Sequence, residues 1–238
     1  MNAYNRFMSL IDLFYPKFCL NCSFPGAYIC PRCQKYLIMP KRPQCYVCKK
    51  NSLNSLTHQL CLRKLDIDGV CYLFYYNGLL KKIIKNFKYR LATKVGYELF
   101  NVIKPNVINR LSFYKDLNGN VVLQPIPLSK DKYNERGFNQ ALLIAKFMNR
   151  YLNLAIADFL TRVKETKPQA NMKTKLDRFR NLKGAFGIKP GTDTQQIKKL
   201  RIILIDDVIT TGSTVKEAAK VLKKNGALKV YVLALAGG

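Results

Sequence analysis

Residues 203–214, Ile203-Leu-Ile-Asp206-Asp207-Val-Ile-Thr210-Thr211-Gly212-Ser213-Thr214, decide the fold of this 238-residue chain. They overlap a nearly all-apolar run with polar ends, 201–206, which is typical of a strand buried on both faces in a parallel sheet. We expect a helix over 214–225, closed by Asn225-Gly226, and a second buried strand over 229–236. Such a strand–helix–strand unit forms a right-handed crossover between two parallel strands. The sequence therefore predicts an α/β fold with a mostly parallel sheet.

The segment that joins this strand to its helix has the composition of a phosphate-binding loop. Ligands of open α/β sheets bind at the carboxyl ends of strands, and a helix N-terminus offers unpaired N–H groups to a phosphate. Four hydroxyls add donors, and one glycine lets the backbone approach closely. Two adjacent carboxylates suit vicinal hydroxyls or Mg²⁺. We therefore predict a site for a ribose 5-phosphate, formed by Asp206, Asp207, Val208, Ile209, Thr210, Thr211, Gly212, Ser213 and Thr214.

Two other interpretations compete with this site. A strand that ends in Asp-Asp also occurs in P-loop ATPases, but their G-x-x-x-x-G-K-[ST] loop is absent from this chain. The second interpretation is an ordinary helix cap formed by Ser213 or Thr214. A plain cap leaves both aspartates and the Thr-Thr-Gly-Ser-Thr run unexplained.

The rest of the chain alternates between strand and helix patterns. We expect a charged loop from Leu128 to Arg136 and a polar loop over 164–183. Apolar runs and helical periodicity predict strands over 71–76, 121–126, 158–163 and 185–188, and helices over 79–90, 92–104 and 138–151. The first of these helices carries a stripe of lysines opposite its apolar face, which is either a solvated face or a phosphate-binding one: Lys81, Lys82, Lys85 and Lys88.

The cysteines predict metal binding. Seven of the eight lie in residues 19–61, and a buried role is expected for Cys71. Four two-residue-spaced pairs supply eight donors, enough for two structural Zn²⁺ ions: Cys19/Cys22, Cys30/Cys33, Cys45/Cys48 and His58/Cys61. The sites are either sequential, with two consecutive pairs each, or interleaved, and one of them is a candidate for a degenerate site. Disulfides would require an oxidising compartment, and the regular gaps favour metal over them.

The charge predicts a polyanionic partner. Lys and Arg total 41 against 14 acidic residues, a formal net charge of +27, and the excess runs through every segment. Nucleic acid, an anionic membrane surface and phosphorylated small molecules all fit such a body. A lysine-rich source proteome is the alternative explanation.

Composition and length predict a folded, soluble, two-part chain. Hydrophobic residues make up 48 % of the chain, and no apolar run reaches the roughly 18 residues of a membrane-spanning helix. The N-terminus lacks the features of a secretory signal, so we expect a cytoplasmic protein. We expect a zinc-ribbon-like module over 1–66, stabilised by its metal, and an α/β domain over 67–238.

Longer motifs resemble known families. The run IILIDDVITTGST resembles the phosphoribosyl-pyrophosphate (PRPP) motif of type I phosphoribosyltransferases, and nearly the whole chain resembles the ComF family. The second resemblance rests on the Cys-x-x-Cys series and on four further segments: Lys88-Tyr-Arg90, Pro125-Ile-Pro127-Leu, Glu135-Arg-Gly-Phe-Asn-Gln140 and Arg178-Phe-Arg-Asn-Leu-Lys-Gly-Ala-Phe186. His58 departs from the cysteine usual in the fourth pair.

The resemblance implies roles for particular residues. Asp206 and Asp207 would hold the ribose hydroxyls of PRPP, residues 210–214 its 5-phosphate, and Mg²⁺ would accompany it. The loop with Pro127, Leu128 and Ser129 corresponds to the pyrophosphate loop of the family. From their charge, we expect five residues to contact pyrophosphate or DNA: Lys88, Arg90, Lys130, Lys132 and Arg136. Arg136 has an alternative role as the structural partner of Glu135.

The family resemblance implies a PRPP-binding protein that handles single-stranded DNA during natural transformation. It would work beside other DNA-uptake proteins at the inner membrane, where it would associate peripherally, and some of its 14 tyrosines, such as Tyr46, Tyr89 or Tyr133, would stack on bases. The alternative is an active phosphoribosyltransferase that releases pyrophosphate onto an acceptor. A third hypothesis is a regulator whose DNA affinity depends on PRPP.

Overall fold

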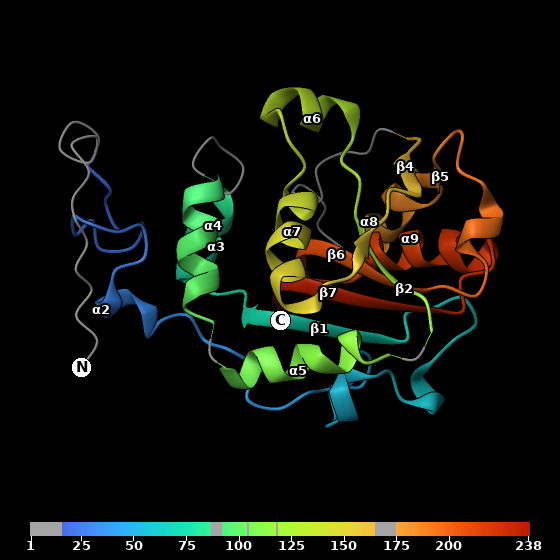
Figure 1. Cartoon of the computed structure of the whole chain (residues 1–238), viewed down its shortest axis with the longest axis horizontal. Helices are drawn as coiled ribbons and strands as arrows, with labels where there is room; N and C mark the ends of the chain where they lie inside the picture. The colour runs from blue at the N-terminus through green and yellow to red at the C-terminus, as the bar shows by residue number, and fades with distance from the viewer. Residues whose placement is uncertain (1–15, 87–91, 104, 118, 165–174) are drawn as a thin grey trace.

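A parallel sheet forms the centre of the molecule (Figure 1). The structure is a computed structural model that describes residues 16–86, 92–103, 105–117, 119–164 and 175–238. Within these ranges five parallel strands run in the order β1-β7-β6-β2-β3. Their bounds are β1 (Gly69–Tyr75), β2 (Val121–Pro125), β3 (Ala155–Ile156), β6 (Arg201–Ile209) and β7 (Lys229–Gly237). The predicted α/β fold with a mostly parallel sheet is confirmed.

Strand β6 is buried on both faces, as its apolar run predicts. Ile203 and Ile205 belong to one core cluster, and Ile202 and Leu204 belong to the other. The neighbouring strand β7 alternates in the same way, because side chains of a strand point to opposite faces in turn. The sheet therefore needs helices on both sides.

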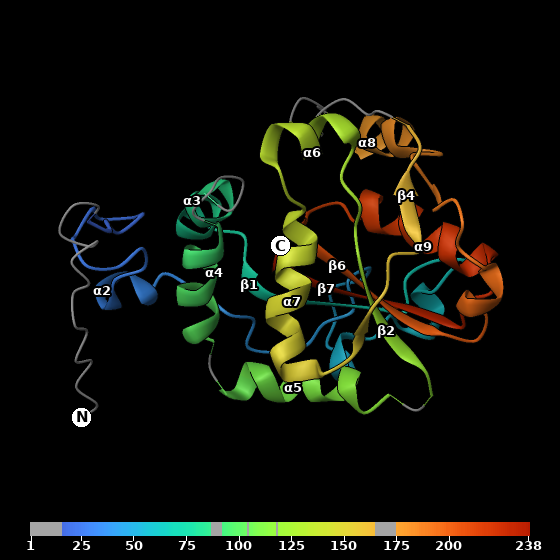
Figure 2. The same cartoon turned by 45° about the horizontal axis from the view of Figure 1, so that its top comes forward.

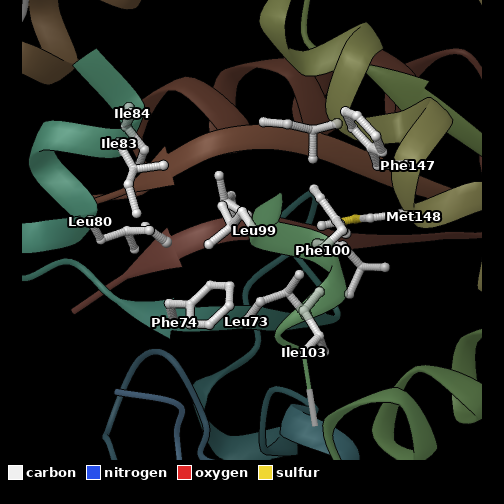
Figure 3. Packing of buried hydrophobic residues seen from close by; sticks show 14 of the residues in the cluster. Leu73, Phe74, Leu80, Ile83, Ile84, Leu99, Phe100, Ile103, Phe147 and Met148 are labelled. Atoms are coloured by element: carbon white, nitrogen blue, oxygen red, sulfur yellow. The ribbon is translucent and has the colours of Figure 1, made fainter. Parts of the chain in front are cut away.

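In the part of the chain that the structure describes, one group of helices covers one face of the sheet and a second group covers the other (Figure 2). The first group is α3 (Gly78–Asn86), α4 (Ala92–Asn101), α5 (Pro105–Lys115) and α7 (Gln140–Leu152). In the core beneath it, Leu73 and Phe74 of β1 meet Ile83 of α3 and Phe100 of α4 (Figure 3). The second group is α8 (Lys175–Leu182) and α9 (Ser213–Lys224), which contact each other. Helix α3 directs its lysine stripe to solvent, with Lys81, Lys82 and Lys85 exposed.

A small antiparallel ribbon lies beside α9. It pairs β4 (Leu160–Arg162), within the expected strand 158–163, with β5 (Phe186–Ile188). Leu160 and Phe186 are buried in the same cluster as α9, so the ribbon packs on that helix rather than extending the main sheet.

Two expectations about loops are wrong, and one helix is shorter than expected. The expected loop from Leu128 to Arg136 contains helix α6 (Lys130–Arg136), and the expected loop 164–183 contains α8. The helix expected over 92–104 ends at Asn101, and α5 follows it. Helix α6 has no fully buried residue, so it lacks the apolar stripe by which helices are found in a sequence. Its end is set by Gly137, which has φ 74° at the C-cap.

The N-terminal cysteine-rich region has little regular structure. It contains α2 (Pro31–Gln34) and two 3₁₀ turns, η1 (Leu53–Ser55) and η2 (Gln59–Cys61). The region contacts the α/β core: the backbone N–H of Ile29 donates to Glu98 of α4 over 2.9 Å, and Cys30 and Cys33 are buried in the same cluster as β1. In the described ranges, no helix combines the length and the apolar character needed to cross a lipid bilayer.

Candidate functional site

The predicted ligand site lies where the direction of strand order reverses. After β2 the chain continues to the outer neighbour β3, whereas after β6 it continues to β7 on the other side. The adjacent carboxyl ends of β2 and β6 thus open a crevice between their loops, which is the usual ligand position in open α/β sheets. The structure brings Pro127 and Leu128 after β2 to the same cleft as Asp206 and Asp207 in β6.

The predicted phosphate loop is short and leads directly into α9. Residues 210–212 join β6 to the helix, and Gly212 has φ 73°, a conformation that favours glycine. The hydroxyl oxygens of Thr211 and Ser213 lie 2.9 Å apart, and a hollow is lined by Asp206 and residues 208–215. The plain-cap interpretation is wrong, because the cap position is Gly212 and both Ser213 and Thr214 lie within the first helical turn.

The two aspartates sit inside the last part of β6 rather than after it. The backbone N–H of Asp207 donates to Asp206 Oδ1 over 2.9 Å, and that of Val208 donates to Asp207 Oδ1 over 2.7 Å. Burial raises the pKa of the Asp206 carboxyl well above its usual range; the charge of Asp207 acts in the same direction, and that of Arg162 acts against it. A buried carboxyl group beside a second carboxylate therefore lowers the stability of the fold, and such unfavourable clusters are typical of binding sites.

We expect Asp206→Asn to stabilise the chain at neutral pH. The folded-state pKa of Asp206 lies above the unfolded value near 3.9, so its ionisation destabilises the fold as the pH rises through that interval. Removal of the charge should add about 0.5–2 kcal/mol at pH 7, and each kcal/mol raises the Tm by about 2–4 °C. The gain should shrink toward pH 4. Thermal unfolding at both pH values measures it, with the exposed Asp116→Asn as control; an equal Tm at pH 7 would contradict the assignment.

Cations line the same cleft as the aspartates. The cavity has a volume of about 190 Å³. Lys132 and Arg136, at α6, line it with Asp206 and Asp207, together with Arg162 of β4. The cleft therefore offers both carboxylates to hydroxyl groups and positive charge to an anion.

Arg136 and Gln140 supply donors that other described residues leave unused. Arg136 Nη1 donates to Gln140 Oε1 over 2.9 Å, so the partner of Arg136 is Gln140 rather than Glu135. Gln140 is only 2 % exposed and lines the cleft, and no described residue accepts a hydrogen bond from its Nε2 or from Arg136 Nε. A buried donor without an acceptor costs about 1–3 kcal/mol. These two groups are thus poised for an acceptor that enters the cleft.

The remaining predicted contacts are distributed differently. Ser129 is 3 % exposed at the residue before α6 and does not line the cleft, and Lys130 faces a second hollow. Lys88, Tyr89 and Arg90 lie outside the described residues. Gln140 and Arg162 were not predicted as site residues. A neutral amide and an arginine on a distant strand belong to no local sequence motif that indicates ligand binding.

The second hollow lies on the other side of the segment that follows β2. Its volume is about 720 Å³, and it shares Pro127, Leu128, Asn139 and Arg162 with the cleft. The side chain of Tyr133 on α6 lines it and is 52 % exposed. Apolar and charged side chains complete the wall, among them Leu142, Ile156, Lys130 and the ion pair Lys189–Asp158.

Two groups of four side chains lie in the cysteine-rich region. One is Cys19, Cys22, Cys30 and Cys33, and the other is Cys45, Cys48, His58 and Cys61. Within each group the candidate ligand atoms lie within 4.8 Å of one another, and all eight cysteines of the chain are described and free. The grouping is sequential, so the interleaved and disulfide alternatives are wrong. Both groups could hold a metal ion such as zinc.

Backbone N–H groups prepare one thiolate in each group. Burial opposes ionisation of Cys19, but the N–H groups of Cys22, Cys30 and Asn21 outweigh it and lower its pKa to about 6. The same balance lowers the pKa of Cys45 to about 7. In the second group, His58 Nε2 lies 3.1 Å from the carbonyl oxygen of Asn51 and Nδ1 lies 3.3 Å from Cys48 Sγ. This orientation directs Nδ1 at the centre of the group, so histidine fits as the fourth ligand.

Comparisons with known proteins find a matching domain family and similar chains. Residues 139–237 match the phosphoribosyl transferase domain family. Competence protein F of Haemophilus influenzae is 38 % identical over 113 residues, which cover 47 % of this chain and 48 % of that protein, or about half of its length. Competence protein ComFC of Bacillus subtilis is 29 % identical over 80 % of this chain and 82 % of its own.

Two further similarities complete the comparison. A solved hypoxanthine phosphoribosyltransferase from Staphylococcus aureus matches 59 % of this chain and 64 % of its own with 14 % identity and a TM-score of 0.36. DNA utilization protein YhgH of Salmonella typhimurium is 32 % identical over 67 % of this chain and 68 % of its own. With that extent of similarity and its phosphoribosyl transferase domain, the chain belongs to the ComF family.

Proposed function

We propose that this chain binds PRPP with Mg²⁺ in the cleft between β2 and β6 and handles single-stranded DNA in natural transformation. The observation that carries the PRPP assignment is the pair of unsatisfied donors on Arg136 and Gln140, which line the same cleft as the carboxylates of Asp206 and Asp207. PRPP has hydroxyls and a diphosphate on one ring, so it complements the carboxylates and the donors at once. A simple phosphate would leave the aspartates without partners.

The proposed ligand spans three parts of the site. Its 5-phosphate accepts hydrogen bonds from the loop and helix N-terminus at residues 211–214. The ribose hydroxyls donate to Asp206 and Asp207. The diphosphate accepts from Gln140 and Arg136, with the charge of Lys132 beside them. Mg²⁺, when bound with the diphosphate, neutralises part of its charge, and the aspartates are the nearest carboxylates for it.

The DNA assignment rests on charge, relatives and the second hollow. Relatives named for competence or DNA utilization support a role in DNA uptake. A net charge of +27 attracts a nucleic-acid backbone, and the exposed ring of Tyr133 beside Lys130 offers a stacking surface for an unpaired base. In this proposal the α/β domain, residues 67–238, binds PRPP and DNA. The module, residues 1–66, binds two structural zinc ions. It would act in the cytoplasm, beside uptake proteins at the inner membrane.

We expect the chain to retard a single-stranded oligonucleotide in a gel at low salt. The affinity should fall steeply with salt, with a log–log slope of about −0.7 for each phosphate neutralised. Tyr133→Ala should weaken binding by about 1–3 kcal/mol if one base stacks there. Tyr36→Ala is the matched control, because Tyr36 has a similar exposure of 48 % and lies far from this hollow along the chain. No retardation at any salt concentration would contradict the DNA role.

The alternative is an active phosphoribosyltransferase, favoured by the walls that the cleft and the second hollow share. An acceptor in the hollow would lie next to the sugar in the cleft. Incubation of the purified chain with Mg²⁺-PRPP and detection of pyrophosphate separates the two proposals. Binding without turnover favours the DNA-handling role, and steady release of pyrophosphate favours the enzyme.

A further inference from the structure

One aromatic residue joins the second metal group to the phosphate loop. Tyr46 lies in the two-residue gap between Cys45 and Cys48. Its ring lies against Gly212, where an added Cβ would be 3.5 Å from Tyr46 Cε2. Tyr46 is also packed against the core cluster that contains α9. Two segments more than 160 residues apart therefore meet at the glycine on which the loop turns.

Polar contacts also link Tyr46 to helix α9. The Tyr46 hydroxyl donates to Asp66 Oδ1 over 3.1 Å. Asp66 Oδ2 lies 3.5 Å from Nζ of Lys216, in the helix that the loop opens. Lys216 Nζ in turn lies 5.2 Å from the centre of the Tyr46 ring. The three side chains form a closed set of contacts.

The Tyr46 ring of this closed set lies next to Gly212, the loop residue that loses the most conformational freedom when the loop is ordered. Glycine loses more conformational freedom on ordering than any other residue, and Gly212 occupies the left-handed region. The N–H groups that follow it can bind a phosphate only when the turn is ordered. An ion bound by both Cys45 and Cys48 would restrict the backbone segment that carries the ring of Tyr46.

We propose that Tyr46 is a positioning residue through which a metal ion in the Cys45/Cys48/His58/Cys61 group orders the phosphate loop. The consequence for ligand affinity rests on the proposed function, but the ordering itself does not. Loss of the ring should raise the Kd for PRPP by about 5- to 20-fold, within the lower part of the range for coupled sites. The metal group then serves binding as well as folding.

The test compares amide hydrogen exchange in the full, zinc-loaded chain. Peptides that cover residues 210–216 should exchange faster in Tyr46→Ala than in wild type, while zinc content stays the same. Tyr46→Phe keeps the ring and loses the bond to Asp66, so an intermediate increase is expected. Tyr36→Ala is the control: Tyr36 lies three residues after Cys33 of the first metal group, and its replacement should leave the loop unchanged.

Calorimetric titration with Mg²⁺-PRPP on the same samples gives the second readout. Faster loop exchange with weaker binding supports the proposal; faster exchange in a series whose wild type does not bind PRPP supports the proposal and rejects the proposed function. Wild-type exchange and wild-type Kd in both Tyr46 variants overturn the proposal and leave PRPP binding intact. If Tyr46→Ala does not fold, wild-type exchange in Tyr46→Phe alone overturns it.

Discussion

Replacing Asp206 and Asp207 together by alanine should abolish the stabilisation of this chain by Mg²⁺-PRPP. Wild type should gain about 2.7 kcal/mol at a ligand concentration 100 times its Kd, which raises the Tm by roughly 5–10 °C. The double variant loses the two carboxylates that line the cleft with Arg136 and that would accept from the ribose hydroxyls. Thermal shift over a PRPP series measures the effect.

The control for this experiment keeps the charge change and moves it away from the cleft. Asp116 is exposed after α5, and Asp158 lies at the second hollow, so alanine at both positions removes two negative charges without touching the cleft. That variant should show the wild-type shift. A folded Asp206→Ala, Asp207→Ala chain with an undiminished shift would refute the site.

Replacing Cys30 and Cys33 together by serine should leave the chain unable to fold at 37 °C. Structural zinc contributes about 10–16 kcal/mol to small cysteine-rich modules, as much as the whole stability of a typical domain. Cys30 and Cys33 are also buried in the cluster that contains β1, so the damage should reach the α/β core. Soluble yield, circular dichroism and zinc content measure it.

Cys71→Ala serves as control for this second prediction. Cys71 is 8 % exposed in β1 and belongs to neither metal group, so its replacement should leave both groups of metal ligands intact. A chain with serine at residues 30 and 33 that contains less metal but melts at the wild-type temperature would show that the first group is dispensable for folding.

The central part of the fold could be predicted because its pattern is local. The apolar run of β6, the helix after it and β7 can each be recognised from a short stretch of consecutive residues. Helix α5 could not be predicted in this way. Its stability depends on residues such as Tyr114, whose ring meets Tyr231 of β7 with centroids 5.7 Å apart, a contact between distant parts of the chain. Helix α6 has no buried residue at all to give a pattern.

The candidate site also contains parts that a local motif predicts and parts that only the fold brings together. The phosphate loop and the four cysteine pairs are contiguous motifs, and the sequence alone identified them. The other lining residues could be found only from the fold, since Gln140 and Arg162 reach the cleft from α7 and β4. Tyr46 shows the limit most clearly. Its neighbours predict a metal site, whereas its contact with Gly212 exists only because the module docks on α9.

A crystal structure of the chain with Mg²⁺-PRPP would show whether the cleft holds this ligand. The 5-phosphate should lie at residues 211–214, the ribose hydroxyls on Asp206 and Asp207, and diphosphate oxygens within hydrogen-bond distance of Gln140 Nε2 and the Arg136 guanidinium. An empty cleft at saturating ligand, or PRPP bound with its ribose turned away from both aspartates, would contradict the proposed site.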